Sequence, residues 1–93
     1  MSNYCYINDI NLIPWDHLDK PIQCKVKTRY RQPEQPATVE QLGEDLIRIT
    51  FQEPQRAVTP GQAAVLYDGD MVLGGGTILS EEAAQTLCKI NEK

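Results

Sequence analysis

One segment of the chain, from Ile22 to Arg31, alternates regularly between two kinds of side chain. One side of the segment is largely apolar and carries Ile22, Cys24, Val26, Thr28 and Tyr30. The other side is polar and mostly basic and carries Gln23, Lys25, Lys27, Arg29 and Arg31. A period of two over this length predicts a β-strand with one buried face and one face in solvent. The fold must therefore contain a sheet that is covered on one side.

Turn signals divide much of the remaining chain into further short strands. One predicted hairpin covers residues 37–52 with its turn at 43–45, and a second covers residues 63–73 with its turn at 68–70. Residues 53–62 are expected to form a loop between the two hairpins. Short strands with frequent turns are typical of an antiparallel fold.

Prolines and glycines mark the places where the chain is expected to bend. Pro60-Gly61 has the residue order of a type II turn, because proline sets φ at the first central position and glycine accepts a positive φ at the second. Pro33 and Pro36 are expected to end the strand at Arg31 and to start a turn. The run Gly74–Gly76 indicates a sharp bend or a close approach of two backbones.

The two ends of the chain differ in character. Residues 4–13 are predicted as a short strand that breaks into a loop, because polar turn formers interrupt it at Asn8, Asp9 and Asn11. Ser80 is a good helix N-cap, and two glutamates follow it where the helix dipole favours acids. A short helix to about Asn91 is therefore predicted, with a frayed tail as the alternative.

These elements predict an all-β fold, a small antiparallel β-barrel of about six strands with a short C-terminal helix. The expected division is an N-terminal strand and proline-rich connector over residues 1–21, a barrel core over 22–79 and a helix or tail over 80–93. A chain of 93 residues is long enough for one domain only.

The formal net charge of −4 argues against a basic nucleic-acid-binding protein of the usual kind. Four basic side chains are nevertheless concentrated on the alternating segment, so any RNA contact is expected to be a local patch. The three cysteines fit neither a disulfide framework nor zinc-ligand spacing, which favours packed thiols in a cytoplasmic protein. No apolar run is long enough to span a bilayer, and no membrane partner is expected.

Catalytic and metal-binding residues are not evident. The single histidine, His17, lies beside acids in the proline-rich connector, where a solvated surface residue is the better interpretation. Gly74–Gly76 lacks the spacing and the lysine of a phosphate-binding loop. Asp68-Gly69-Asp70 lacks the remaining ligands of a calcium loop. We therefore expect no catalytic residue and no metal site in this chain.

The basic row of Lys25, Lys27, Arg29 and Arg31 has two interpretations. It is either a solvated strand face, including an edge that positive charge protects from aggregation, or an anion-binding surface. The end of the row combines guanidinium groups with the ring of Tyr30, and such groups suit phosphates and unpaired bases. The pattern alone leaves both interpretations open.

Four blocks in this chain resemble the end of the bacterial tRNA-specific 2-thiouridylases. They read KTRYRQ at 27–32, PQRAVTPGQ at 54–62, YDG at 67–69 and LGGG at 73–76. Each block alone is weak, but their order is specific, and the resemblance runs from about Ile22 to Ile78.

The resemblance implies a longer parent enzyme that activates the wobble uridine of certain tRNAs with ATP and then transfers sulfur to it. Its ATP-binding signature and both catalytic cysteines would lie upstream, so this chain is expected to hold no cofactor and to be inactive alone. In the family the barrel helps to hold the tRNA, and the contacts correspond here to Arg29, Tyr30 and Gln62. Lys25, Lys27 and Arg31 are expected to give electrostatic support. The implied partners are tRNA, the upstream catalytic domains and a sulfur-relay protein.

A second hypothesis is a barrel that docks proteins or its own missing domains, similar to the second domain of translational GTPases. It predicts that the apolar residues Ala57, Val58 and Val65 matter for assembly, whereas the basic row does not.

Overall fold

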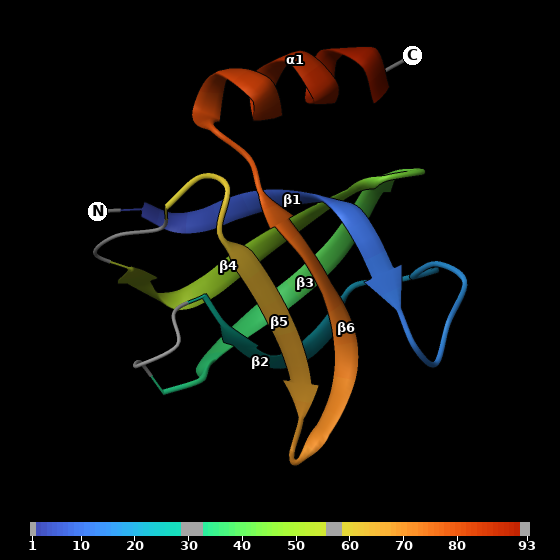
Figure 1. Ribbon diagram of the computed structural model, residues 1–93, viewed down its shortest axis with the longest axis vertical. Helices are drawn as coiled ribbons and strands as arrows, with labels where there is room; N and C mark the ends of the chain where they lie inside the picture. Colours follow the sequence, from blue (N-terminus) through green and yellow to red (C-terminus); the bar gives the residue numbers. More distant parts are fainter. Residues whose placement is uncertain (1, 29–32, 56–58, 92–93) are drawn as a thin grey trace.

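Antiparallel strands close into a barrel in the order β1-β4-β3-β2-β5-β6, and one helix follows the last strand (Figure 1). The structure is a computed structural model that describes residues 2–28, 33–55 and 59–91. Its elements are β1 (Ser2–Leu12), β2 (Ile22–Lys27), β3 (Gln35–Gly43), β4 (Leu46–Gln55), β5 (Ala63–Asp68), β6 (Met71–Ile78) and α1 (Glu81–Asn91). This confirms the predicted fold, an antiparallel barrel of six strands with a C-terminal helix.

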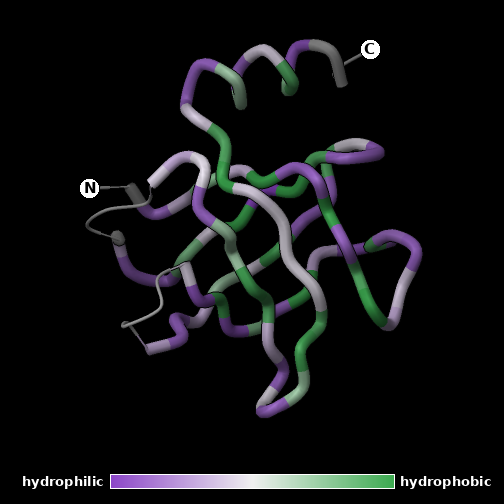
Figure 2. Tube along the Cα trace, viewed as in Figure 1, coloured by the Kyte–Doolittle hydropathy of each residue, from purple (hydrophilic) through white to green (hydrophobic). Residues whose placement is uncertain are grey.

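The interior of the barrel is filled by branched side chains from all six strands. The largest fully buried side chains include Ile7, Val26, Val39, Ile49 and Leu66. Hydrophobic and hydrophilic residues alternate along several strands (Figure 2). This is the expected pattern of strands with one face inside a barrel and one face outside.

Strand β1 is longer than the sequence pattern predicts. Its pairing with β6 shifts register between Asn8 and Asn11, and Asp9 takes a positive φ of 51° there. The carboxylate of Asp45 accepts the backbone N–H groups of Asp9 and Ile10 at 3.0 and 2.8 Å. The expected break into a loop is therefore wrong: it is a β-bulge, satisfied by a side chain distant in sequence, and the strand continues to Leu12.

Two prolines lie inside strands, contrary to the predictions of a turn at Pro36 and of a loop over residues 53–62. Strand β3 begins at Gln35 and includes Pro36. The pairing of β3 with β4 starts only at Ala37. Strand β4 continues to Gln55 and includes Pro54, where the pairing with β1 is irregular. Proline is tolerated at strand starts and at irregular pairings, because its missing N–H costs little there.

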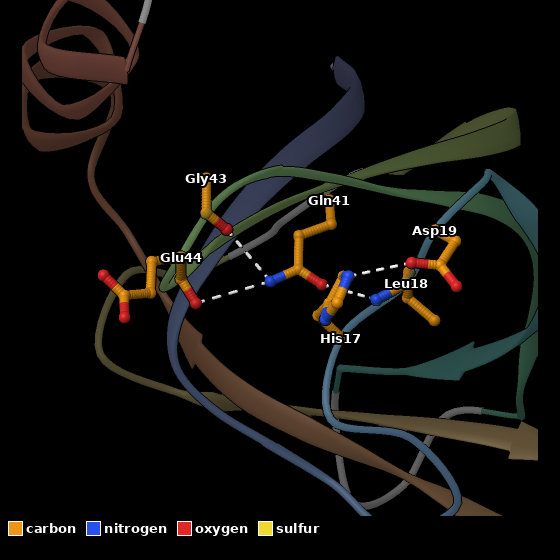
Figure 3. A network of polar contacts seen from close by, with 6 residues as sticks. All are labelled: His17, Leu18, Asp19, Gln41, Gly43 and Glu44. Atoms are coloured by element: carbon orange, nitrogen blue, oxygen red, sulfur yellow. Dashed lines mark hydrogen bonds and ion pairs between the residues drawn. The ribbon is translucent and has the colours of Figure 1, made fainter.

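The connector between β1 and β2 is tied to the β3–β4 hairpin by one glutamine (Figure 3). Leu18 is buried, and its N–H donates to Oε1 of Gln41 at 2.6 Å. Nε2 of Gln41 donates to the carbonyl oxygens of Gly43 and Glu44. The irregular segment thus contributes a side chain to the core.

The glycine run in β6 allows two backbones to approach closely. A Cβ atom at Gly76 would lie 2.6 Å from the carbonyl oxygen of Asn8, and Cβ atoms at Gly74 and Gly75 would collide with the backbone of β1 and β5. Both neighbouring strands pair with β6 along this run. The predicted close approach is confirmed.

Helix α1 begins as the sequence predicts. Oγ of Ser80 accepts the N–H of Ala83 at 3.2 Å, which is N-cap geometry. Ala84, in the first turn of α1, is buried. In the part of the chain that the structure describes, no helix has the length and apolar character needed to cross a membrane.

Candidate RNA interface

Strand β2 carries the start of the predicted basic row. Val26 is fully buried, Lys25 is exposed and Lys27 is half-buried, so the predicted alternation is confirmed as far as Lys27. The strand ends at Lys27, four residues earlier than the predicted end at Arg31, and Thr28 lies outside it. Arg29, Tyr30 and Arg31 are outside the described residues, so their roles stay predictions.

Because β2 is paired on both sides, one interpretation of its lysines fails. The strand is hydrogen-bonded to β3 on one side and to β5 on the other. A strand inside a closed barrel has no open edge. The lysines therefore do not protect an edge, and a solvated face or an anion contact remains.

The turn before β5 holds Gln62 in a defined geometry. The N–H of Gln62 donates to the carbonyl oxygen of Thr59 at 3.2 Å, and Gly61 has a φ of 87°, so the predicted type II turn is confirmed. The N–H of Gly61 and the carbonyl oxygen of Gln62 both bond to the backbone of Ile78, each at 2.8 Å. The backbone of Gln62 is thus fixed while its side chain is exposed.

The topology brings these two features to one end of the barrel. Strands β2 and β5 are antiparallel, with Lys27 opposite Val65 and Lys25 opposite Tyr67. The end of β2 therefore lies beside the start of β5, which Gln62 immediately precedes. The chain enters residues 29–32 from the same end of the barrel at which Gln62 is exposed.

The outer face next to β1 carries a polar row that the sequence reasoning did not identify. Arg48 lies opposite both Tyr6 and Glu40 on neighbouring strands, and its Nη2 contacts Oε2 of Glu40 at 3.1 Å. Partial burial lowers the pKa of Arg48, but its hydrogen bonds and the charge of Glu40 outweigh this effect and raise it. The sequence did offer one indication of this face: Tyr4 and Tyr6 are two residues apart, which places both side chains on the same side of β1.

Two of the three free cysteines, Cys5 and Cys24, are poorly suited to nucleophilic chemistry. Burial raises the pKa of the Cys5 thiol to about 12. Burial, with a smaller effect of the charge of Asp68, raises the pKa of Cys24 to about 11. Both thiols stay protonated at neutral pH, and the thiolate is the reactive form.

His17 is a surface residue. Its Nε2 lies 2.8 Å from Oδ1 of Asp19, and both side chains are mostly exposed (Figure 3). Across residues 2–28, 33–55 and 59–91, no group of three or more His, Cys, Asp or Glu side chains could hold a metal ion.

Comparisons with known proteins agree with the β-barrel fold. Residues 2–78 match the family model of the aminomethyltransferase beta-barrel domain. The chain is 50% identical over 70 residues to the tRNA-specific 2-thiouridylase MnmA of Clostridioides difficile (strain 630), which covers 75% of this chain and 19% of that protein. It is 45% identical over 86 residues to the protein of the same name from Staphylococcus carnosus (strain TM300), covering 90% of this chain and 23% of that protein.

This chain thus spans only about a fifth of the length of those two relatives. The family model ends at residue 78, before α1 begins at Glu81. The chain belongs to the aminomethyltransferase β-barrel domain family, in the form found in the MnmA-type tRNA-specific 2-thiouridylases.

Proposed function

We propose that this barrel helps to position tRNA for ATP-dependent 2-thiolation of the wobble uridine by a longer parent enzyme. The relatives are named as tRNA-specific 2-thiouridylases, which makes tRNA the expected partner. ATP activation and sulfur transfer are assigned to upstream domains, with a sulfur-relay protein as donor. The barrel contributes binding and orientation and no chemistry of its own.

The observation that carries this proposal is the exposed Gln62 on a backbone fixed at both of its peptide groups. A side chain on a rigid turn loses little backbone entropy when it binds a partner. An amide both donates and accepts hydrogen bonds, so it can read the edge of an unpaired base or a ribose hydroxyl. The proposed contacts Arg29 and Tyr30 follow Thr28, the first residue after β2, and the end of β2 lies beside this turn.

The charge of the chain determines how such a contact must work. With a net charge of −4, the barrel has no overall attraction for RNA, so phosphate neutralisation is limited to a few side chains. Lys25 is exposed on β2 and supplies one of them. Binding by the barrel alone is therefore expected to be weak, with most of the affinity coming from the whole enzyme.

The test compares three forms of the full-length parent: unchanged, Gln62→Ala and Gln23→Ala. Gln23 is an exposed amide at the opposite end of β2 and serves as the matched control. Loss of one base or ribose contact predicts about a 5- to 10-fold weaker tRNA affinity for Gln62→Ala, with slower thiolation at low tRNA concentration. Gln23→Ala should behave like the unchanged enzyme. Equal affinity and thiolation for Gln62→Ala and Gln23→Ala would remove the role assigned to Gln62.

A second candidate function, docking of the upstream domains, is favoured by a separate observation. Ile13, Trp15, Met71 and Val72 are large apolar side chains that are 39–66% exposed. The N–H of Ile13 bonds to the carbonyl oxygen of Leu73 at 2.9 Å, which brings the connector against the β5–β6 hairpin. Exposed apolar side chains on adjoining segments are typical of an interface.

Docking and RNA binding use different residues, so they can be separated. Trp15→Ser in the parent should lower its thermal stability by loosening the upstream domains, with little effect on tRNA affinity. Lys25→Glu should weaken tRNA binding and leave the thermal transition unchanged. Of the residues that the docking hypothesis named, Val65 is half-buried in β5, and Ala57 and Val58 lie outside the described residues.

A further inference from the structure

A cleft of about 540 Å³ lies between α1 and the outer face of the barrel. Figure 1 shows α1 standing over one end of the barrel, reached from the end of β6. The lining residues that matter here are Tyr4, Tyr6, Pro60, Glu81, Gln85 and Lys89. The volume is within the range of small-ligand sites.

The barrel side of the cleft is aromatic. Tyr4 and Tyr6 form an edge-to-face pair with ring centroids 5.8 Å apart and planes at 86°. Tyr6 is half-buried opposite Arg48 of β4, whereas Tyr4 is 49% exposed. Tyr4 therefore offers a ring against which a planar group can stack.

The helix side of the cleft combines the small side chains of Ala84 and Cys88 with a polar row that carries three kinds of group. Glu81, Gln85 and Lys89 are spaced by four residues, so they lie in one row along the helix. The carboxylate accepts hydrogen bonds, the ammonium donates them, and the amide does both. All three side chains are exposed.

The helix that supplies this row is anchored. Ser80 caps its first turn, and the buried Ala84 lies on the same side as the row. The cleft is thus a site with one stacking surface and one hydrogen-bonding edge.

We propose that this cleft binds an unpaired purine base of RNA, with guanine as the best match. A purine is planar and stacks on a tyrosine ring. The N1–H and N2–H groups of guanine match a carboxylate acceptor, and its O6 matches an ammonium or amide donor. Adenine has no N1–H and an amino group where guanine has O6, so it fits this row less well.

The inference rests on the proposed tRNA-positioning function and deepens it. Pro60 lines the cleft and belongs to the same turn as Gln62. An RNA strand that contacts Gln62 can therefore place a neighbouring base in the cleft. The family match ends at residue 78, so the helix side of the cleft lies outside the part of the chain that the family model covers.

The experiment titrates the 93-residue chain with GMP, AMP, UMP and CMP while backbone amide resonances are followed by NMR. GMP should shift the amides of Tyr4, Glu81 and Gln85 and should bind most tightly. Tyr4→Ala should weaken GMP binding about tenfold, whereas Tyr4→Phe should stay within about twofold of the unchanged chain. Glu81→Gln should reduce the preference for GMP over AMP.

Two controls separate a lost contact from lost structure. Trp15→Ala removes an exposed ring that does not line the cleft, and it should bind GMP normally. Tyr4 is half exposed, so Tyr4→Ala is expected to fold, and its thermal transition checks this. Absence of GMP-induced shifts at the cleft, or equal GMP affinity of Tyr4→Ala and the unchanged chain, overturns the proposal.

The outcome also distinguishes this proposal from the function on which it rests. If Gln62→Ala weakens tRNA binding but GMP does not bind the cleft, the cleft proposal fails and the tRNA role stands. If GMP binds as expected but Gln62→Ala leaves tRNA affinity unchanged, the role of Gln62 fails instead. Shifts that appear at the cleft only when the parent's other domains are present, and not with nucleotide, identify a protein contact and overturn the proposal.

Discussion

At the scale of single residues, the proposed function depends on backbone geometry that few side chains allow. Gly61 has a φ of 87°, and no atom would lie within 4 Å of a Cβ added there. The cost of replacing it is therefore conformational strain and not a collision. Left-handed backbone is costly for most residues and less so for asparagine.

We predict that Gly61→Ala lowers the free energy of unfolding by about 1 kcal/mol, because alanine is strained at this φ. Gly61→Asn should cost less, since asparagine tolerates the left-handed region. Urea denaturation of the two variants and the unchanged chain measures both values. Equal stability of all three would show that the turn does not require a positive φ.

The buried thiols give a second residue-scale prediction, which concerns alkylation at pH 8. With its pKa raised from 9.0 to about 12, Cys5 holds roughly a thousandfold less thiolate than an unperturbed cysteine. Iodoacetamide should therefore modify Cys5 far more slowly in the folded chain than in urea. Mass spectrometry of tryptic peptides follows the modification, and equal rates in both conditions would contradict the burial of Cys5.

At the scale of elements, local sequence rules predicted correctly the features that depend on residues close together in the sequence. The alternation of β2 to Lys27, the type II turn at Gly61 and the Ser80 cap all depend on contacts within a few residues, and all three are confirmed. The bulge in β1 could not be predicted, because its N–H groups are satisfied by Asp45, 36 residues after Asp9 in sequence. Pro36 was misassigned because strand pairing outweighed its turn preference.

The role of Asp45 is itself testable. Its carboxylate accepts two backbone N–H groups of the β1 bulge, so Asp45→Ala should destabilise the chain by about 1 to 2 kcal/mol. Asp45→Asn retains one acceptor oxygen and should lose less. Asp70→Ala, at the exposed β5–β6 turn, is the control. Thermal denaturation gives the comparison, and the account of the bulge fails if Asp45→Ala and Asp70→Ala are equally stable.

At the scale of the whole molecule, the closed barrel explains why the candidate site is made of strand ends and turns. Every strand is paired on both sides, so the backbone offers no open edge to a partner. Partners must be bound by side chains on the outer faces and at the ends. That the end of β2 at Lys27 lies close to the turn of Gln62 could not be predicted from the sequence, since this closeness depends on the antiparallel pairing of β2 with β5.

The location of the cleft could not be predicted from the sequence. Tyr4 and Tyr6 are at the start of the chain, and Gln85 is near its end. Only closure of the barrel through β1 and β6 brings these segments together. A short amphipathic helix gives no local signal of the surface that it will cover.

The central claim, that tRNA contacts the end of the barrel that carries Gln62, is tested most directly by photocrosslinking. A photoreactive residue is placed at position 62 of the full-length parent, or at position 23 at the opposite end of β2 as control, and tRNA is added. The account predicts a strong crosslink from position 62 that excess unlabelled tRNA abolishes, and little from position 23. No crosslink from position 62, or equal crosslinks from both positions, would contradict it.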